Sequence, residues 1–241
     1  MMKFSTISNI GKVRQTNEDS YGNVSIENYD FFVVADGMGG HSDGEVASSL
    51  ACTSFTDFIE NSKVEDFDSI VDFQEKAILY ANNEVYKLAT EKNEKMGTTV
   101  VCLCIDYKEN ILHIAHVGDS RIYLYRADEL IQLTKDHSLI NELIDSGALN
   151  EEEANHFANK AAVTRAVGVS ADILPDNKSL AYEKDDIILL VTDGLTNELE
   201  PKDIVEVIKN YDDVFDISMN LVDKAIDKGG RDNVTVTTVK I

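Results

Sequence analysis

Strands that follow one another without an intervening helix constrain the fold of this chain most. Short apolar runs that are typical of buried strands occur in direct succession at residues 98–105, 111–117 and 122–125. Glu109-Asn110 is expected to turn the first run into the second, and residues 118–120 are expected to turn a second hairpin. This succession favours antiparallel pairing over a doubly wound parallel sheet. Further buried strands are predicted at residues 31–35, 187–191 and 234–239.

Apolar residues at steps of three and four predict amphipathic helices within residues 47–58, 67–88 and 214–225. Buried strands combined with long amphipathic helices predict an α+β fold in which sheets lie between layers of helices. Residues 136–168 are mostly polar, with short helical stretches, and are expected to leave the core. The 241 residues contain two prolines and no Gly/Ser-rich linker, so we predict one domain over residues 1–241.

The composition excludes several classes of partner. The net charge of −22 repels nucleic acid and anionic membranes at long range. Apolar runs stay far below the roughly 18 residues of a membrane helix, so no membrane insertion is predicted. The first residues lack the apolar region of a signal peptide, so the expected location is cytoplasmic. Cys52, Cys102 and Cys104 form no CxxC pair and are expected to be small buried side chains.

An aspartate with a glycine nearby recurs at the ends of the predicted strands, as Asp36-Gly37, Gly118-Asp119, Asp193-Gly194 and, before the last strand, Gly230-Arg231-Asp232. In an antiparallel sheet one strand ends beside the start of the next, so Asp193 and Asp232 are expected to share an edge. Clustered carboxylates repel one another unless a cation neutralises them. Oxygen ligands suit Mg²⁺, Mn²⁺ or Ca²⁺. The alternative interpretation is that each Asp-Gly pair is an ordinary turn.

Other catalytic motifs are incomplete. The glycine-rich residues 37–42 lack the third glycine of a dinucleotide-binding loop, and there is no P-loop GK[ST]. The five histidines have no zinc-site spacing with cysteine. Asp36 is not expected to be a phosphorylated nucleophile, because such enzymes carry a second Asp two residues on and Met38 stands there.

Eight segments together resemble a known family. They are RQTNED at residues 14–19, DGMGGH at 36–41, GTT at 97–99, GDSR at 118–121, TKDHS at 134–138, TRAVG at 164–168, TDGL at 192–195 and GGRDNVT at 229–235. In this order they resemble the metal-dependent Ser/Thr protein phosphatases of type 2C, in their compact bacterial form. The resemblance implies a four-layer α-β-β-α sandwich with two central antiparallel sheets, and a flap subdomain at about residues 137–169.

The resemblance also implies a two-metal centre that holds Mn²⁺ or Mg²⁺. Asp36 would bridge the two ions, and the Gly37 carbonyl would be a further ligand. Asp193 and Asp232 would hold the first ion. A water or hydroxide that bridges the ions would then hydrolyse the phosphomonoester without a covalent intermediate.

Further residues carry over from the same resemblance. Asp19 would act on the ions largely through bound waters, with Glu18 beside it. Asp119 and Asp193 match the ligands of a third ion that bacterial members often bind. Arg14 would bind the substrate phosphate, because a guanidinium fork fits phosphate oxygens.

The general acid is the one departure from the family pattern. Many eukaryotic members have His directly after Asp-Gly, whereas Met38 stands there in this chain. His41, three residues further on, is the substitute candidate, and a local hydrogen-bonding role for it is the alternative.

Some motif residues are expected to be structural. Residues 97–99 are expected to tighten a strand start, Asn233 to support Asp232 in a turn, and Arg121 and Arg165 to brace loops.

The implied substrates are proteins phosphorylated on Ser or Thr, and the implied partner is a cognate Ser/Thr protein kinase. A monomer is expected, because the chain has enough apolar sequence to close its own core. Two alternatives stay open at this point. One is a phosphatase-like module that binds phosphoproteins without turnover, and the other is a metallohydrolase of phosphodiesters or small metabolites.

Overall fold

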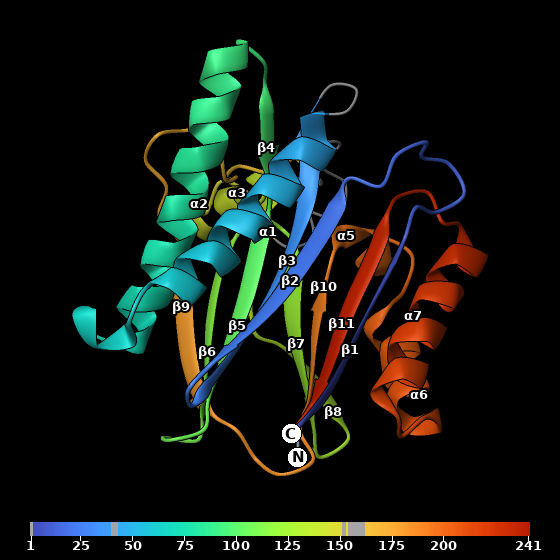
Figure 1. Cartoon of the computed structure of the whole chain (residues 1–241). Helices are drawn as coiled ribbons and strands as arrows, with labels where there is room; N and C mark the ends of the chain where they lie inside the picture. The colour runs from blue at the N-terminus through green and yellow to red at the C-terminus, as the bar shows by residue number, and fades with distance from the viewer. Residues whose placement is uncertain (1, 40–42, 151–152, 154–161) are drawn as a thin grey trace.

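Two antiparallel sheets packed face to face form the centre of the molecule (Figure 1). The computed structural model describes residues 2–39, 43–150, 153 and 162–241. The first sheet has the strand order β1 (Lys3–Asn9), β11 (Val234–Lys240), β10 (Ile187–Val191), β7 (Arg121–Arg126) and β8 (Glu129–Gln132). The second has the order β2 (Asp19–Ile26), β3 (Tyr29–Gly39), β5 (Val100–Asp106), β6 (Ile111–Val117) and β9 (Asp176–Ala181), and the short β4 (Met96–Thr98) pairs with the end of β3.

The alternation of side chains along β3 shows how the layers are built. Phe32 and Val34 point toward the other sheet and join the core between the sheets, where Ile188 and Leu190 of β10 also lie. Phe31 and Val33 point the opposite way, into a second core beneath the helices. A strand that is apolar on both faces fits only between two covering layers, which is why residues 31–35 form one continuous apolar run.

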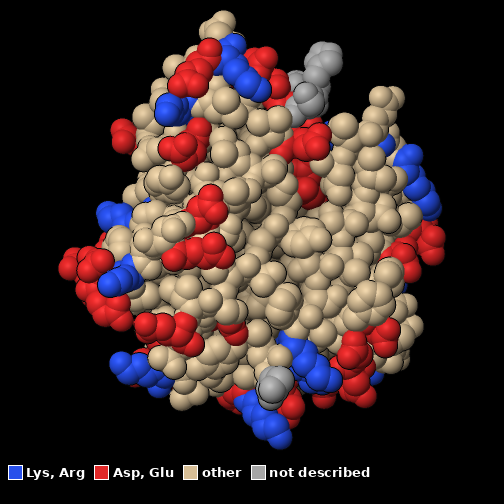
Figure 2. All heavy atoms as spheres, viewed as in Figure 1, with Lys and Arg blue, Asp and Glu red and all other residues tan. Residues whose placement is uncertain are grey.

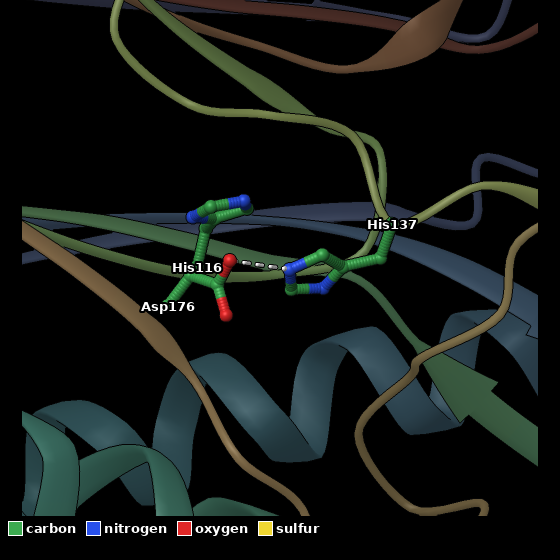
Figure 3. Close-up of side chains that lie close together, drawn as sticks. All are labelled: His116, His137 and Asp176. Carbon is green, nitrogen blue, oxygen red and sulfur yellow. Dashed lines mark ion pairs between the residues drawn. The ribbon is translucent and has the colours of Figure 1, made fainter. Parts of the chain in front are cut away.

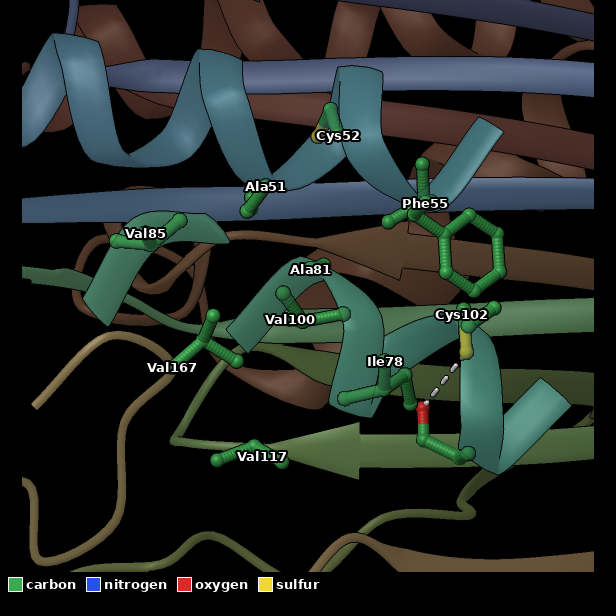
Figure 4. Packing of buried hydrophobic residues seen from close by; sticks show 14 of the residues in the cluster. Ala51, Cys52, Phe55, Ile78, Ala81, Val85, Val100, Cys102, Val117 and Val167 are labelled. Atoms are coloured by element: carbon green, nitrogen blue, oxygen red, sulfur yellow. Dashed lines mark hydrogen bonds between the residues drawn. The ribbon is translucent and has the colours of Figure 1, made fainter. Parts of the chain in front are cut away.

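Helices cover the outer face of each sheet, which gives four layers. The helices α1 (Asp43–Asn61) and α2 (Ile70–Lys92) cover the second sheet, and Figure 4 shows Phe55 of α1 and Ile78 of α2 in the core that includes Cys102 and Val117 of the strands. On the first sheet lie α6 (Pro201–Asn210) and α7 (Val214–Lys228). The side chain of Ser69 accepts a hydrogen bond from Asp72 N and so starts α2, which therefore begins after Phe67 rather than at it.

The predicted second hairpin is wrong. β6 pairs with β5 and β9, whereas the next strand, β7, pairs with β10 and β8 of the other sheet. Residues 118–120 therefore carry the chain from one sheet to the other. Local sequence did not reveal this, because a short polar turn with glycine serves a hairpin and a crossing equally well. The consequence is that Asp119 lies where the two sheets meet.

Two short helices lie near this edge of the sandwich, α3 (Leu139–Asp145) and α5 (Asp193–Thr196). The first falls within the predicted flap, of which residues 151–152 and 154–161 lie outside the described residues. Acidic side chains outnumber basic ones on the face that Figure 2 shows, in keeping with the net charge of −22. No helix within the described ranges has the length and apolar character needed to cross a membrane.

Candidate metal centre

Two carboxylates from the second sheet face the gap between the sheets at one edge. Asp19, the first residue of β2, is the register partner of Asp36 in β3, so the two side chains project from the same face. Asp36 lies two and four residues beyond Val34 and Phe32, and by strand alternation it points toward the other sheet.

The first sheet brings its own carboxylates to the same edge. Asp193 opens α5 two residues after the end of β10, and Asp232 lies two residues before β11, which pairs antiparallel with β10. The hydrogen bond from Thr192 N to Thr235 O, 3.1 Å, extends this pairing to the two acids. The sequence prediction that Asp193 and Asp232 share an edge is therefore consistent with the pairing, and the crossing at Asp119 adds a further acid.

Burial and mutual repulsion raise the pKa values of these acids. The pKa of Asp36 lies well above its usual range because the group is buried and because Asp19 and Asp193 repel its charge. Burial raises the pKa of Asp19 to about 7, against the opposing effect of the Thr235 hydroxyl. Burial, followed by repulsion from Asp193, also raises the pKa of Asp119 to about 7. The edge is thus a set of carboxyl groups whose ionised forms are disfavoured, and a bound cation would stabilise those ionised forms.

Asp193 and Glu18 follow the same trend. The pKa of Asp193 is raised by burial and then by Asp232. The pKa of Glu18 is raised by burial, which the nearby Arg14 partly opposes.

One buried carboxylate oxygen at this edge has no hydrogen-bond partner among the described residues. Asp19 Oδ2 accepts hydrogen bonds from Thr235 Oγ1 at 2.6 Å and Thr192 Oγ1 at 2.9 Å. Asp19 Oδ1 is buried and accepts none from the part of the chain that the structure describes. Buried polar atoms are almost always satisfied, so this oxygen calls for a ligand, and a hard cation or its bound water fits.

Neighbouring threonines fix the backbone that carries Asp36. Thr99 Oγ1 accepts from Asp36 N at 3.0 Å, and Thr98 Oγ1 donates to Asp36 O at 2.8 Å. These contacts agree with the structural role expected for residues 97–99. The next residue must be glycine, since a Cβ on Gly37 would lie 2.0 Å from the carbonyl oxygen of Gly44.

Arg14 lies beside the acids. Its Nη2 is 2.7 Å from Asp232 Oδ2 and its Nη1 is 3.7 Å from Glu18 Oε2, while about half of its side chain is exposed. The guanidinium is thus within reach of both the acids and the solvent. His41, the candidate general acid, lies outside the described residues.

Asn233 has a larger role than the turn that its sequence position suggested. Its Nδ2 donates to Ile10 O at 2.9 Å and Thr16 O at 3.0 Å, and its Oδ1 accepts from Glu18 N at 2.8 Å. This one buried amide fastens the loop that carries Arg14 to the turn that carries Asp232. Sequence gave no signal for it, because the partners are main-chain groups more than two hundred residues away.

The structure also places His116, His137 and Asp176 together, with one potential ligand atom from each within 4.8 Å of the others (Figure 3). Nothing in their sequence spacing indicated this cluster.

The two arginines that were expected to brace loops do form ion pairs. Arg121 Nη2 is 2.7 Å from Asp136 Oδ2, and Arg165 Nη1 is 2.9 Å from Asp176 Oδ1.

A four-layer sandwich with several buried carboxylates gathered at one edge of its two sheets is the arrangement expected of a metal-dependent hydrolase. The family model "Protein phosphatase 2C" matches residues 8–234, and the chain belongs to this family. It is a serine/threonine protein phosphatase, as the sequence motifs predicted.

Relatives with this fold come from several bacteria. Protein phosphatase PhpP of Streptococcus pneumoniae is 33% identical over 242 residues, covering 100% of this chain and 98% of the relative. Serine/threonine phosphatase stp of Listeria innocua is 35% identical over 236 residues, covering 95% and 92%. The predicted fold class is confirmed by the serine/threonine phosphatase of S. agalactiae, which superposes with a TM-score of 0.91 at 33% identity and 100% coverage of both chains. The PstP catalytic domain in complex with two manganese ions has a TM-score of 0.83 at 29% identity, covering 99% of this chain and 97% of that one.

Proposed function

We propose that the acid edge is the catalytic centre at which this phosphatase hydrolyses phosphoserine and phosphothreonine in proteins. The observation that carries the proposal is the set of buried acids with raised pKa values around Asp36, together with the unpartnered Asp19 Oδ1. Two divalent cations at such a site supply an activated water and offset the charge on the phosphoryl oxygens.

The chain's own groups have distinct tasks in this proposal. Asp36 lies between the acids of both sheets and is suited to bridge two Mn²⁺ or Mg²⁺ ions, with the Gly37 carbonyl beside it. Asp193 and Asp232 would hold the first ion. Asp19, which has one oxygen fixed by two threonines, and Glu18 would orient waters bound to the ions.

Two further groups complete the centre. Asp119 and Asp193 are assigned to a third ion, and the repulsion between them supports this pairing. Arg14 takes the substrate phosphate. Its guanidinium fork, about half exposed beside Asp232, fits two phosphate oxygens. His41 remains the candidate for protonating the leaving alcohol.

Hydrolysis of a phosphothreonine peptide in Mn²⁺, in Mg²⁺ or in chelator tests the proposal. Wild type is compared with Asp193→Ala and with Asp223→Ala, a matched control that removes an exposed acid from α7. We expect metal-dependent release that is lost in Asp193→Ala and retained in Asp223→Ala. Phosphate release that survives both chelator and Asp193→Ala would mean that these acids are ordinary turn residues and not metal ligands. Tight peptide binding without release would favour a binding module, and preference for a diester reporter would favour another hydrolase.

The finer partners are inferred from the family resemblance. We infer a cognate Ser/Thr protein kinase whose products this enzyme dephosphorylates, a cytoplasmic location and a monomeric state. The monomer is checked by light scattering coupled to size exclusion, where a dimer mass at micromolar concentration would contradict it.

A further inference from the structure

A cluster of two buried histidines and one exposed aspartate lies next to the acid edge and has no role in the mechanism above. It consists of His116 on β6, His137 after β8 and Asp176 at the start of β9 (Figure 3). Both histidines are almost fully buried, and their rings stack with centroids 4.6 Å apart.

The hydrogen bonds of His137 fix which ring nitrogen carries its proton. Gly118 N donates to His137 Nδ1 at 3.1 Å, so Nδ1 holds a lone pair and the proton is on Nε2. Nε2 lies 3.3 Å from Asp176 Oδ2, which is an acceptor for that proton. Arg165 Nη1 is also 3.3 Å from Nε2, but it has its own acceptor in Asp176 Oδ1 at 2.9 Å.

This assignment argues against a cation within the cluster. A metal ligand must offer a lone pair, and His137 Nε2 has none while Nδ1 accepts from Gly118. Arg165 already supplies the positive charge beside Asp176. On the other ring, His116 Nε2 lies 2.8 Å from the Lys135 carbonyl, which only accepts, so that nitrogen also carries a proton.

His137 forms hydrogen bonds with both peptide groups that flank Gly118. Its ring accepts from Gly118 N, and its own backbone N donates to Gly118 O at 2.9 Å. The orientations of two successive peptide planes determine φ and ψ of the residue between them. Gly118 has φ +112°, a conformation that favours glycine, and a Cβ there would lie 2.6 Å from Thr99 Cβ.

The conformation of Gly118 sets the direction in which the next residue, Asp119, leaves the turn. On its other side, Ser120 Oγ is 2.7 Å from Thr99 Oγ1, the atom that also accepts from Asp36 N. The turn that carries Asp119 is therefore held from one side by Thr99 and from the other by His137. The carbonyl of His137 in turn accepts from Thr164 N at 2.9 Å, which ties the base of the following segment to the same point.

We propose that His137 is a positioning residue for Asp119, and that it sets the affinity of the third divalent-cation site formed by Asp119 and Asp193. This inference rests on the assignment of Asp119 under the proposed function. Loss of a group that orients a metal ligand lowers affinity by about tenfold to a hundredfold. The two ions held around Asp36 are expected to bind as before, because Thr98 and Thr99 fix that backbone independently.

Calorimetric titration of the metal-free enzyme with Mn²⁺ tests the proposal without depending on activity. His137→Ala should weaken the weakest binding event about tenfold. His137→Asn should keep the affinity of this event near that of wild type, because Asn Oδ1 can take the place of Nδ1 and accept from Gly118 N. His137→Gln should not keep it. Asp119→Asn should remove the event, and adding His137→Ala to that variant should change the titration no further. Thermal unfolding of each variant reports whether it is folded.

Three results would overturn the role of His137. The first is a wild-type titration for His137→Ala. The second is equal weakening of every Mn²⁺ event, which would indicate general damage to the fold. The third is a loss caused by His137→Ala that persists in the Asp119→Asn background, which would mean that the histidine cluster itself binds metal. If His137→Ala does not fold, the Mn²⁺ titrations of His137→Asn and His137→Gln are compared instead. Equal affinities in these two variants would also overturn the role of His137. A wild-type titration for Asp119→Asn would instead overturn the assignment of Asp119, and the role of His137 with it.

Discussion

The two ends of β10 carry aspartates in opposite circumstances. Asp186, just before the strand, is buried and fully paired. Arg126 donates to its two oxygens at 2.8 and 2.6 Å, and Glu183 N donates to Oδ2 at 2.7 Å. Asp193, just after the strand, accepts a hydrogen bond from Asn197 Nδ2 at 3.0 Å and lies near other acids, and burial, followed by repulsion from Asp232, raises its pKa.

The difference separates a structural end of the sandwich from a chemical one. A buried charge with a bidentate arginine is neutralised within the chain, and removing either partner destabilises the fold. A larger set of buried acids that shares one half-exposed arginine, Arg14, destabilises the fold until an external cation binds. One end of β10 therefore carries an ion pair that is closed within the chain, Arg126 with Asp186, and the other end carries the acid edge, which is open to an external cation. The stability of the protein should respond oppositely to changes at these two ends.

Replacing the central acid should have the largest effect. Asp36→Asn is expected to lower kcat/KM for a phosphothreonine peptide by at least about a thousandfold, because the bridging charge between the ions is lost. In chelator the same variant should be more stable than wild type, because a buried repelling charge is gone. Asp186→Asn should be less stable, since it leaves Arg126 with a weaker partner. Thermal unfolding in chelator measures the stability of both variants. If Asp36→Asn and Asp186→Asn changed stability in the same direction, the contrast between the two kinds of buried aspartate would be wrong.

Breaking the closed pair should affect stability alone. Arg126→Met leaves Asp186, whose side chain is 1% exposed, without its cation and should lower the free energy of unfolding by about 3 kcal/mol. Urea denaturation measures the change. In the folded protein, the Mn²⁺ dependence of peptide hydrolysis should match wild type. A shifted Mn²⁺ dependence would mean that the two ends of β10 are coupled.

The strands that sequence predicted are those that tertiary contacts bury on both faces. The run at residues 111–117 coincides with β6, and the run at 187–191 with β10. β1, β2, β8 and β9 went unrecognised because all four are edge strands and carry exposed polar residues, as in DNKSLA of β9. Their conformation is imposed by pairing with a buried neighbour rather than by their own apolar pattern.

The site divides in a similar way. Four of the acids could be predicted from local pattern, because Asp36, Asp119, Asp193 and Asp232 each lie at a strand end with a glycine beside them or two residues away. Asp19 and Glu18 were predicted only from the family resemblance. The roles of Asn233 and His137 were not predictable, because each acts on main-chain atoms of a distant segment, and any residue can supply those atoms. The crossing at Gly118 was misread as a hairpin because the sheet that a strand joins depends on long-range pairing.

The open end should make the stability of the metal-free enzyme depend on pH. Burial raises the pKa of Asp19 from 3.8 to about 7, so the folded state binds more protons than the unfolded state between these values. Stability in chelator should therefore fall as pH rises through this window, by about 2 kcal/mol between pH 5 and pH 7 for one such carboxyl. Urea denaturation at several pH values measures it. Saturating Mn²⁺ should remove the fall, and stability that rises with pH in chelator would contradict the assignment.

The smallest expected effect concerns Arg14, which lies between the open acids and solvent. Arg14→Lys keeps the charge but loses the fork that contacts two phosphate oxygens, so KM for the phosphopeptide should rise about tenfold with little change in kcat. Inhibition by inorganic phosphate should weaken by a similar factor, because the lost contact is to the phosphoryl group and not to the peptide. Lys12→Arg, on the same loop but paired with the exposed Asp227, is the matched control and should leave both constants unchanged. If Arg14→Lys instead lowered kcat and left phosphate inhibition intact, Arg14 would act by holding Asp232, 2.7 Å away, and so belong to the acid edge.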